Sequence, residues 1–209
     1  MADRPRVFIE DHFPTAELGI ESVRERAAAS ALPPIYFLHV WWARRPLVAS
    51  AGAILGSLLP VWSPELAGSF SQRPELATAD AYRTWFLRLC GILGDPVLGR
   101  KLIDEANATG RKLKGNGYGY KQAYKNSPPP EQVALLHEVL EHTWGRVPSV
   151  SDPTAGGGSI PYEALRYDLP THANDLNPIA ASVLRAGVEL PARFGTDLVD
   201  DLQHWGEGL

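Results

Sequence analysis

The sequence predicts a mixed α/β protein in which a helical N-terminal region precedes the first β-α-β-α part of a doubly wound sheet. Three observations support this fold class. Apolar residues recur at helical spacing in several segments before residue 146. A glycine cluster at 156–158 follows a short apolar lead-in, as at a tight strand-to-helix turn. Strand-like and helical pieces then alternate up to Pro178, which indicates parallel strands joined by helices.

The helical segments are marked by prolines and by apolar faces. We expect helices over Thr15–Ala31, Pro46–Leu59, Thr78–Leu93 and Glu131–Gly145. Residues 111–130 combine three glycines, three tyrosines and several lysines with a proline triplet, so they read as an exposed loop between two subdomains. The expected domains are a mainly helical region at 1–125 and a partial sheet region at 126–209.

Charge is distributed unevenly along the chain, whose net charge is −4. Residues 1–125 hold 16 Lys and Arg against 12 Asp and Glu, whereas residues 126–209 hold 4 against 12. This asymmetry favours one part that faces phosphate and another that holds a cofactor, although a solvated basic helix face explains it equally well. The composition is that of a soluble globular protein, with neither a signal peptide nor a membrane span, so we expect a cytoplasmic location.

The sequence predicts no metal site. The single cysteine, Cys90, excludes a cysteine-based zinc site within this chain. The stretch "HEVLEH" places His142 five residues after His137, off the helix face on which a zinc-binding pair would lie.

The glycine loop is the strongest candidate for a ligand site. Val147–Pro153 reads as a strand, Ser159–Tyr167 as a helix and Thr171–Asp175 as a second strand. Glycines without a Cβ let a ligand lie against the backbone, and the helix that follows offers free N–H groups. Asp175 comes nineteen residues after Gly156, where it is placed to accept hydrogen bonds from a ribose diol.

Three ligands fit this geometry in principle: a nucleoside triphosphate, a dinucleotide and S-adenosylmethionine. The residues of the loop exclude the first two. A nucleoside triphosphate loop needs Gly-Lys-Ser/Thr, but the residues here are Gly158-Ser159-Ile160. The dinucleotide fingerprint needs a third glycine where Pro161 stands. S-adenosylmethionine has no pyrophosphate and remains as the expected cofactor, with a glycine turn that binds no ligand as the alternative.

Two stretches resemble known proteins. "DPTAGGGSIPYEA" followed by "NDLNPIA" is similar to motif I and the acidic motif of amino-group methyltransferases acting on nucleic acids, with Thr154 where Phe is usual. The opening "FPTAELGIESVRERAAASALPPIYFLHVWWARRPLVAS" resembles that of adenine-specific DNA methylases with a downstream zinc ribbon, an opening catalogued as domain of unknown function 1156. The resemblance covers residues 8–60 and 147–187, and it implies a Rossmann-like S-adenosylmethionine-dependent methyltransferase fold, present here only in part.

The resemblance also implies the residues of the cofactor site. Glu163, in the helix after the loop, would orient it. The implied cofactor-binding residues are Asp152, Pro153, Thr154, Ala155, Gly156, Gly157, Gly158, Ser159, Glu163, Asp175, Leu176 and Asn177.

No catalytic residue is assigned, because the Asp/Asn-Pro-Pro-aromatic tetrad of that group is absent and "NSPPPE" at 126–131 does not replace it. The zinc ribbon is absent too. The resemblance therefore implies the N-terminal, cofactor-binding portion or subunit of a DNA adenine-N6 methyltransferase, of the kind used in restriction-modification or phage defence. A missing C-terminal half or a partner subunit would complete it, and the isolated chain is expected to be inactive. The alternative is a non-catalytic binding or regulatory module that keeps the half-site for assembly with a partner.

Two stretches are candidates for DNA contacts. Trp41, Trp42, Arg44 and Arg45 belong to "HVWWARRPL". Either the tryptophan pair fills the seam between the N-terminal helices and the cofactor domain, with the arginines capping or bridging, or an arginine meets a DNA phosphate or the cofactor carboxylate. The loop at 111–125 either contacts nucleic acid or is a mobile linker. Its candidates are Lys112, Lys114, Tyr118, Tyr120 and Lys121.

Overall fold

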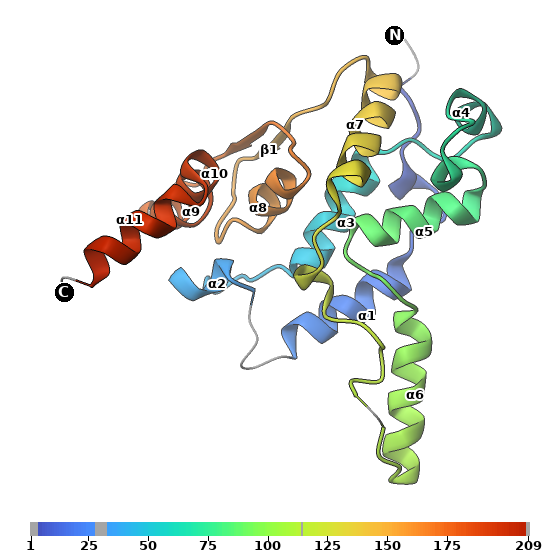
Figure 1. Cartoon of the computed structure of the whole chain (residues 1–209), viewed down its shortest axis with the longest axis horizontal. Coiled ribbons are helices and arrows are strands. Elements are labelled where there is room, and N and C mark those ends of the chain that lie inside the picture. Colours follow the sequence, from blue (N-terminus) through green and yellow to red (C-terminus); the bar gives the residue numbers. More distant parts are fainter. Residues whose placement is uncertain (1–3, 28–32, 114, 208–209) are drawn as a thin grey trace. The chain divides into compact units, whose positions relative to one another are not determined.

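The computed structural model describes residues 4–27, 33–113 and 115–207 (Figure 1). In chain order the α-helices are α1 Thr15–Arg26, α2 Ile35–Leu38, α3 Leu47–Leu58, α4 Pro64–Ser69, α5 Ala79–Leu89, α6 Pro96–Thr109, α7 Pro130–Trp144, α8 Ser159–Arg166, α9 Pro178–Leu184, α10 Leu190–Phe194 and α11 Asp197–Gly206. The strands are β1 Val150–Asp152 and β2 Thr171–Ala173. Short 3₁₀ turns lie at Phe8–Glu10 (η1), Pro74–Leu76 (η2) and Ala123–Lys125 (η3), and a π-helical turn (η4) at Arg185–Glu189 joins α9 to α10. Within the described residues, no helix is long and apolar enough to cross a membrane.

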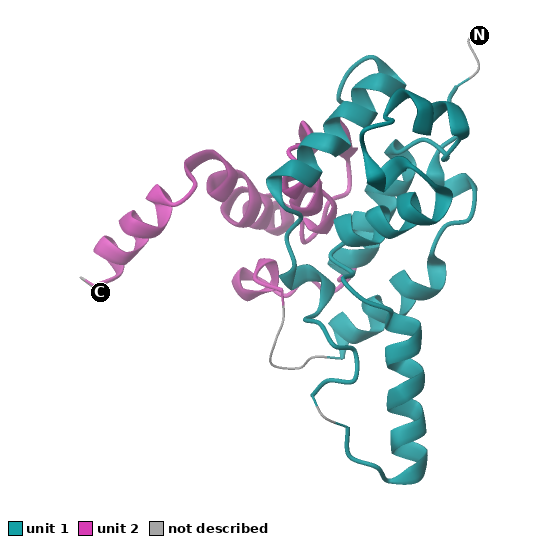
Figure 2. Ribbon diagram, turned by 45° about the vertical axis from the view of Figure 1, so that its right-hand side comes forward, with its two compact units in different colours: residues 1–31, 46–148 teal, residues 32–45, 149–209 magenta. Residues whose placement is uncertain are grey.

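The chain forms two compact units (Figure 2). Unit 1 comprises residues 1–31 and 46–148, and unit 2 comprises residues 32–45 and 149–209. This division differs from the sequence-based one at residue 125 in two ways. Helix α7 belongs to unit 1, and the segment 32–45 belongs with the C-terminal strands.

Unit 1 is helical, and its core is built from the apolar faces of α3, α5 and α7. Leu55, Phe86 and Leu136 are fully buried there. An aromatic cluster extends this core, since the ring of Phe8 lies 4.7 Å from that of Phe86 and 5.6 Å from that of Tyr82. The apolar spacing that predicted these helices therefore marks the buried faces.

Two buried carboxylates of α1 satisfy backbone and side-chain groups elsewhere in unit 1. Helix α3 begins after Pro46, which offers no side-chain cap, and the Glu25 carboxylate accepts from the N–H groups of Leu47 at 2.9 Å and Val48 at 3.3 Å. Glu21 accepts from the Tyr120 hydroxyl at 2.8 Å and from the Ala123 N–H at 3.2 Å. A buried acid is tolerated where such donors replace water. The loop before α7 is thus fastened to α1.

Unit 2 contains the order β1-α8-β2-α9. The two strands pair in parallel, with Val150 opposite Thr171, Ser151 opposite His172 and Asp152 opposite Ala173. A parallel pair needs a crossover connection, which α8 supplies. The mixed α/β class expected from the sequence is confirmed at this level, with a sheet of two strands in the described part of the chain.

The four helices expected before residue 146 are present, and most are a few residues shorter than expected. Helix α1 ends at Arg26, and the last residues of the expected helix, 28–31, lie outside the described residues. Helix α6 lies in a stretch for which the sequence analysis expected no element. Its signals were nevertheless complete: Asp95 caps the Leu98 N–H at 2.9 Å, Pro96 opens the helix, and Gly110 ends it at a φ of 68°.

Candidate functional site

The glycine loop and the end of the second strand meet in unit 2. Oδ2 of Asp175 accepts a hydrogen bond from the Gly156 N–H at 2.8 Å, and its Oδ1 accepts from the Asn177 N–H at 2.9 Å. The main chain adds two bonds, since Ala155 N–H donates to the Asn174 carbonyl at 3.0 Å and Asn174 N–H to that of Asp152 at 2.9 Å. The residues that the sequence predicts to share a ligand site are therefore in direct contact.

The Asp175 carboxylate is held ionised. Backbone N–H groups, first that of Asn177 and then that of Gly156, lower the pKa of this carboxyl group below its ordinary value. Each carboxylate oxygen has a second acceptor position beyond the bond it already makes. Asp175 can therefore organise the loop and still accept from a ligand hydroxyl.

Asp152 presents a buried oxygen that has no partner. The residue is 6% exposed, and its Oδ1 accepts from the Thr154 N–H at 3.1 Å. Its Oδ2 is buried and makes no hydrogen bond within the described residues. Because an unsatisfied buried acceptor is costly, this atom marks a position where a donor group of a ligand would be favourable.

The loop combines positive φ values with free N–H groups. Gly156 and Gly158 have φ values of 53° and 83°, a conformation that favours glycine. The N–H groups of Gly157 and Ser159 make no hydrogen bond within the described residues, and Ser159 opens α8. Loop and helix start together offer donors to a polar or anionic group.

The remaining predicted cofactor residues lie in or beside these elements with different environments. Glu163 is fully buried on α8 and binds Arg166 Nη1 at 2.8 and 3.0 Å. Asn177 caps α9 by accepting from the Ile179 N–H at 2.9 Å. Leu176 is 96% exposed, and Pro153 and Thr154 are exposed as well.

Trp41 packs onto the glycine loop. The indole is only 9% exposed. A Cβ built on Gly156 would lie 2.7 Å from Trp41 Nε1, and one built on Gly157 would lie 2.9 Å from Trp41 Cβ. The missing side chains at these two glycines thus make room for Trp41. Trp42, by contrast, is 86% exposed, so the two tryptophans do not fill one seam together.

A small cavity of about 50 Å³ lies between this segment and the loop. The Tyr36 hydroxyl donates to the Arg45 carbonyl at 2.6 Å, and the Arg44 guanidinium lies 5.9 Å from the Tyr36 ring. These contacts bring the two arginines to the cavity. Its lining contains no acidic residue and consists of Tyr36, Trp41, Ala43, Arg44, Arg45, Thr154, Ala155, Gly156, Gly157 and Ser159.

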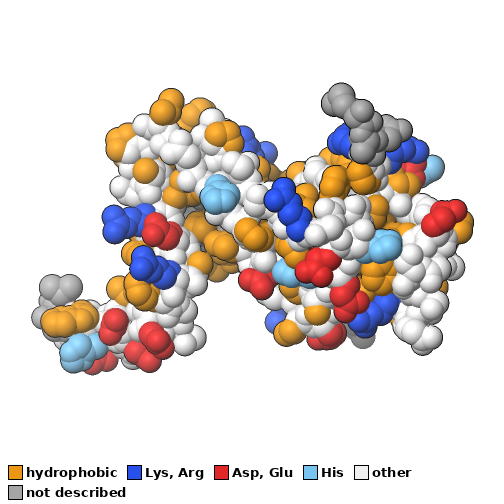
Figure 3. Space-filling view, turned by 90° about the horizontal axis from the view of Figure 1, so that it is seen from above, with side chains coloured by type: hydrophobic (Ala, Val, Ile, Leu, Met, Phe, Trp, Pro, Cys, Tyr) orange, Lys and Arg blue, Asp and Glu red, His pale blue; other side chains and the backbone are white. Residues whose placement is uncertain are grey.

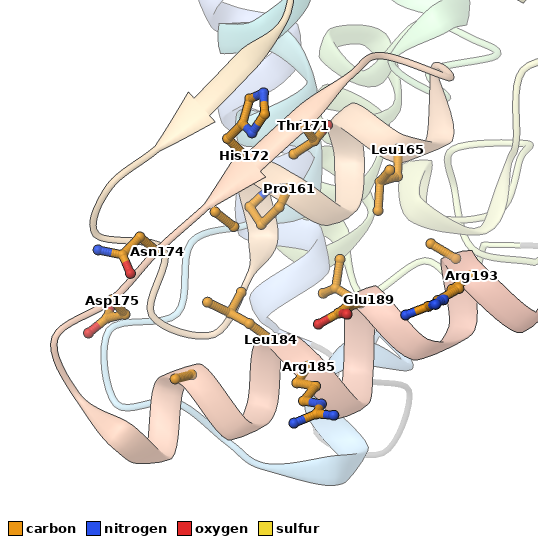
Figure 4. A pocket seen from close by; sticks show the side chains of 14 residues that line it. Pro161, Leu165, Thr171, His172, Asn174, Asp175, Leu184, Arg185, Glu189 and Arg193 are labelled. Atoms are coloured by element: carbon orange, nitrogen blue, oxygen red, sulfur yellow. The ribbon is translucent and has the colours of Figure 1, made fainter.

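A much larger cavity, of about 670 Å³, lies along β2 (Figure 4). Its lining comes from β2, from α8 and from the continuous helical stretch α9 to α10. Asn174 and Asp175 lie at one end, and Arg185, Glu189 and Arg193 project from the helical side (Figure 4). This cavity has the volume of a small-molecule site but does not include the glycine loop.

The loop at 111–125 belongs to unit 1 and packs against the rest of it through aromatic side chains. The Arg24 guanidinium lies 4.2 Å from the centre of the Tyr118 ring and 4.9 Å from that of Tyr120. The same two rings also pack against glycines of unit 1, because a Cβ on Gly99 would meet the Tyr118 ring and one on Gly94 would meet the Tyr120 ring. Lys112 and Lys121 are exposed, whereas Lys114 lies outside the described residues.

Helix α11 has exposed apolar side chains. Leu202 and Trp205 are 65% and 73% exposed there. In Figure 3 apolar and acidic side chains lie side by side at this end of the chain, next to the grey terminal atoms. Among the described residues, no group of three or more His, Cys, Asp and Glu side chains is placed to hold a metal ion.

Comparison with known proteins gives one match. The family model described as "Protein of unknown function (DUF1156)" matches residues 12–86, which confirms the resemblance of the opening stretch and extends it beyond residue 60. No curated protein and no solved structure matches the chain. The match includes the Trp41 segment but ends well before the glycine loop that this segment contacts.

Proposed function

We propose that this chain is the S-adenosylmethionine-binding portion of a DNA adenine-N6 methyltransferase, completed by a partner subunit or a C-terminal half that brings the catalytic motif. The observation that carries the proposal is the 2.8 Å hydrogen bond from Gly156 to Asp175. It joins the glycine loop after one parallel strand to the acid after the next, and ligands of doubly wound sheets bind at these carboxyl ends.

The residues present fit the cofactor. When bound, S-adenosylmethionine supplies an electrophilic methyl group. The ionised Asp175 accepts from the ribose hydroxyls, and the unpartnered Oδ2 of Asp152 accepts from the ammonium of the amino-acid part. Trp41 covers Gly156 and Gly157 on the side where a Cβ would lie.

A second candidate function is a non-catalytic module that keeps this half-site for assembly with a partner. The specific observation that favours it is the absence of an Asp/Asn-Pro-Pro-aromatic tetrad from the sequence. Methyl transfer needs groups that align the acceptor amine and stabilise the charge developing on it. The two candidates differ in whether the cofactor binds at all.

Calorimetry with S-adenosylmethionine tests the proposal. We expect the parent chain to bind weakly and Asp175→Ala to bind about tenfold more weakly or worse, because charge-assisted hydrogen bonds are lost. Asp201→Ala, at an exposed acid on α11, is the matched control and should bind like the parent. Equal affinities for Asp175→Ala and the parent would contradict the assigned role.

An assay of tritiated methyl transfer to adenine-rich duplex DNA tests the division of labour. The 209 residues alone should transfer no methyl group, because they contain no recognisable catalytic set. Robust incorporation that disappears in Asp175→Ala would show a complete active site and would overturn this part of the proposal.

A further inference from the structure

Trp42, Arg44 and Arg45 are exposed residues of the segment that packs on the glycine loop through Trp41, and the proposed cofactor site does not use them. The Trp42 ring is 86% exposed, although its neighbour Trp41 is buried. Both arginines are exposed, and neither forms an ion pair within the described residues. We call these three residues the Trp-Arg cluster.

The surroundings of the Trp-Arg cluster are electropositive. The sequence has no acidic residue between positions 27 and 64, and the cavity that both arginines line has none either. The same cavity is lined by Gly157 and Ser159, whose N–H groups make no hydrogen bond within the described residues. Two guanidinium groups and uncommitted backbone donors around about 50 Å³ suit one oxyanion.

The exposed indole identifies the oxyanion's source. A carboxylate or a free phosphate needs the arginines alone and gives no reason for a large aromatic ring to face solvent beside them. A nucleic-acid strand presents a phosphate next to a base whose flat face stacks on an aromatic side chain. The Trp-Arg cluster offers a partner for each.

The loop at 111–125 is the competing surface, and its aromatic residues are already engaged. Arg24 lies over the rings of Tyr118 and Tyr120, and the Tyr120 hydroxyl donates to Glu21. The described residues of that loop include exposed lysines but no aromatic side chain as exposed as Trp42. Its lysines can contact phosphates, but the loop provides no comparable ring on which a base could stack.

We propose that the Trp-Arg cluster binds single-stranded nucleic acid, with Trp42 stacking on a base while Arg44 and Arg45 hold the adjacent phosphate. The inference rests on the proposed function in that it names the surface that takes the DNA. It places the bound strand next to the glycine loop, where a methyl acceptor has to come.

Fluorescence anisotropy of a fluorescein-labelled 20-nucleotide single strand, measured without S-adenosylmethionine, tests the proposal. Trp42→Ala should weaken binding about tenfold through lost stacking. The double variant Arg44→Gln/Arg45→Gln should reduce the salt slope by about 0.7, because the two arginines hold one phosphate and each phosphate contact on a single strand contributes about 0.7. An oligonucleotide with neutral methylphosphonate linkages should show little difference between the parent and the double variant.

Matched controls change the same residue types elsewhere. Trp205→Ala removes another exposed tryptophan, and Lys112→Gln/Lys121→Gln removes two exposed cations from the competing loop. Both control variants should keep the oligonucleotide binding that depends on the Trp-Arg cluster.

Three results would overturn the proposal. Parent-like binding by both cluster variants would remove the cluster from the interface, and losses confined to the lysine variant would place the DNA on the 111–125 loop. Weaker S-adenosylmethionine binding by the arginine variant, with oligonucleotide binding unchanged, would assign the arginines to the cofactor carboxylate. Because the oligonucleotide assay contains no cofactor, its outcome is independent of whether the cofactor site is correct.

Discussion

Replacing Trp41 by alanine tests how the glycine loop is held in place. Trp41 fills the space above Gly156 and Gly157, so a Cβ on either glycine would clash with it. Removing it leaves a void against the loop that the backbone between β1 and α8 has to fill or tolerate. We therefore expect local destabilisation of this part of unit 2.

The size of the effect follows from the burial of the ring. A tryptophan contributes about 200 Å² of surface, and Trp41 is 9% exposed. At about 25 cal/mol per Å² this burial amounts to about 4.5 kcal/mol, and residual compactness of the unfolded chain lowers it to about 3–4 kcal/mol. Measured tryptophan-to-alanine losses in protein cores, about 3–5 kcal/mol, agree with this value.

Hydrogen exchange followed by mass spectrometry is the appropriate assay, because it reports on peptides from 150–167 separately from unit 1. Exchange of this region should accelerate strongly in Trp41→Ala. Trp42→Ala is the matched control, since it removes the same side chain at a position that is 86% exposed, and its effect should stay within about 0.5 kcal/mol. Equal exchange in the two variants would refute the reasoning.

Three further changes test other parts of the structure. Glu25→Ala should cost unit 1 about 1–3 kcal/mol in thermal unfolding, because it leaves the Leu47 and Val48 N–H groups without an acceptor, and Glu25→Gln should recover part of the loss; an unchanged melting temperature would exclude the capping role. Tyr120→Phe removes the donor to Glu21 and should cost about 1.5–3 kcal/mol in urea unfolding, whereas parent-like stability would show that this contact contributes nothing. The lowered pKa of Asp175 means that its carboxylate contributes fully above the ordinary carboxyl value of 3.8, and that this contribution is lost as the pH falls through the lower folded value. Amide resonances of Gly156 and Asn177 should therefore be constant from pH 8 to pH 5 and shift only at more acidic pH; a transition near neutrality would contradict the assignment.

The local signals of the sequence predicted the elements around the candidate site. Pro178 marked the start of α9, and the structure shows this proline at the first helical turn, with Asn177 as the cap. The spacing from Gly156 to Asp175 predicted that both lie at one ligand site, and the structure shows a hydrogen bond between them. These features depend on neighbouring residues and on the rule that parallel strands end at one edge, so a single sequence can carry them.

Features that depend on distant residues were not predictable in this way. Nothing in the spacing of "HVWWARRPL" indicates that Trp41 packs on a loop more than a hundred residues later. The domain boundary at 125 followed composition, whereas α7 and the segment 32–45 are assigned by their contacts. Helix α6 differs from these features, since its cap, proline and terminal glycine are local signals that the sequence contains.

Photolabelling with methyl-tritiated S-adenosylmethionine, followed by peptide mapping, tests the central claim most directly, because it captures even weak binding. The account predicts label in peptides between residues 149 and 184 of the parent chain, with the signal lost in Asp175→Ala and retained in Asp201→Ala. Label confined to unit 1, or label in 149–184 that is unchanged by Asp175→Ala, would contradict the claim that the glycine loop and Asp175 form the cofactor site.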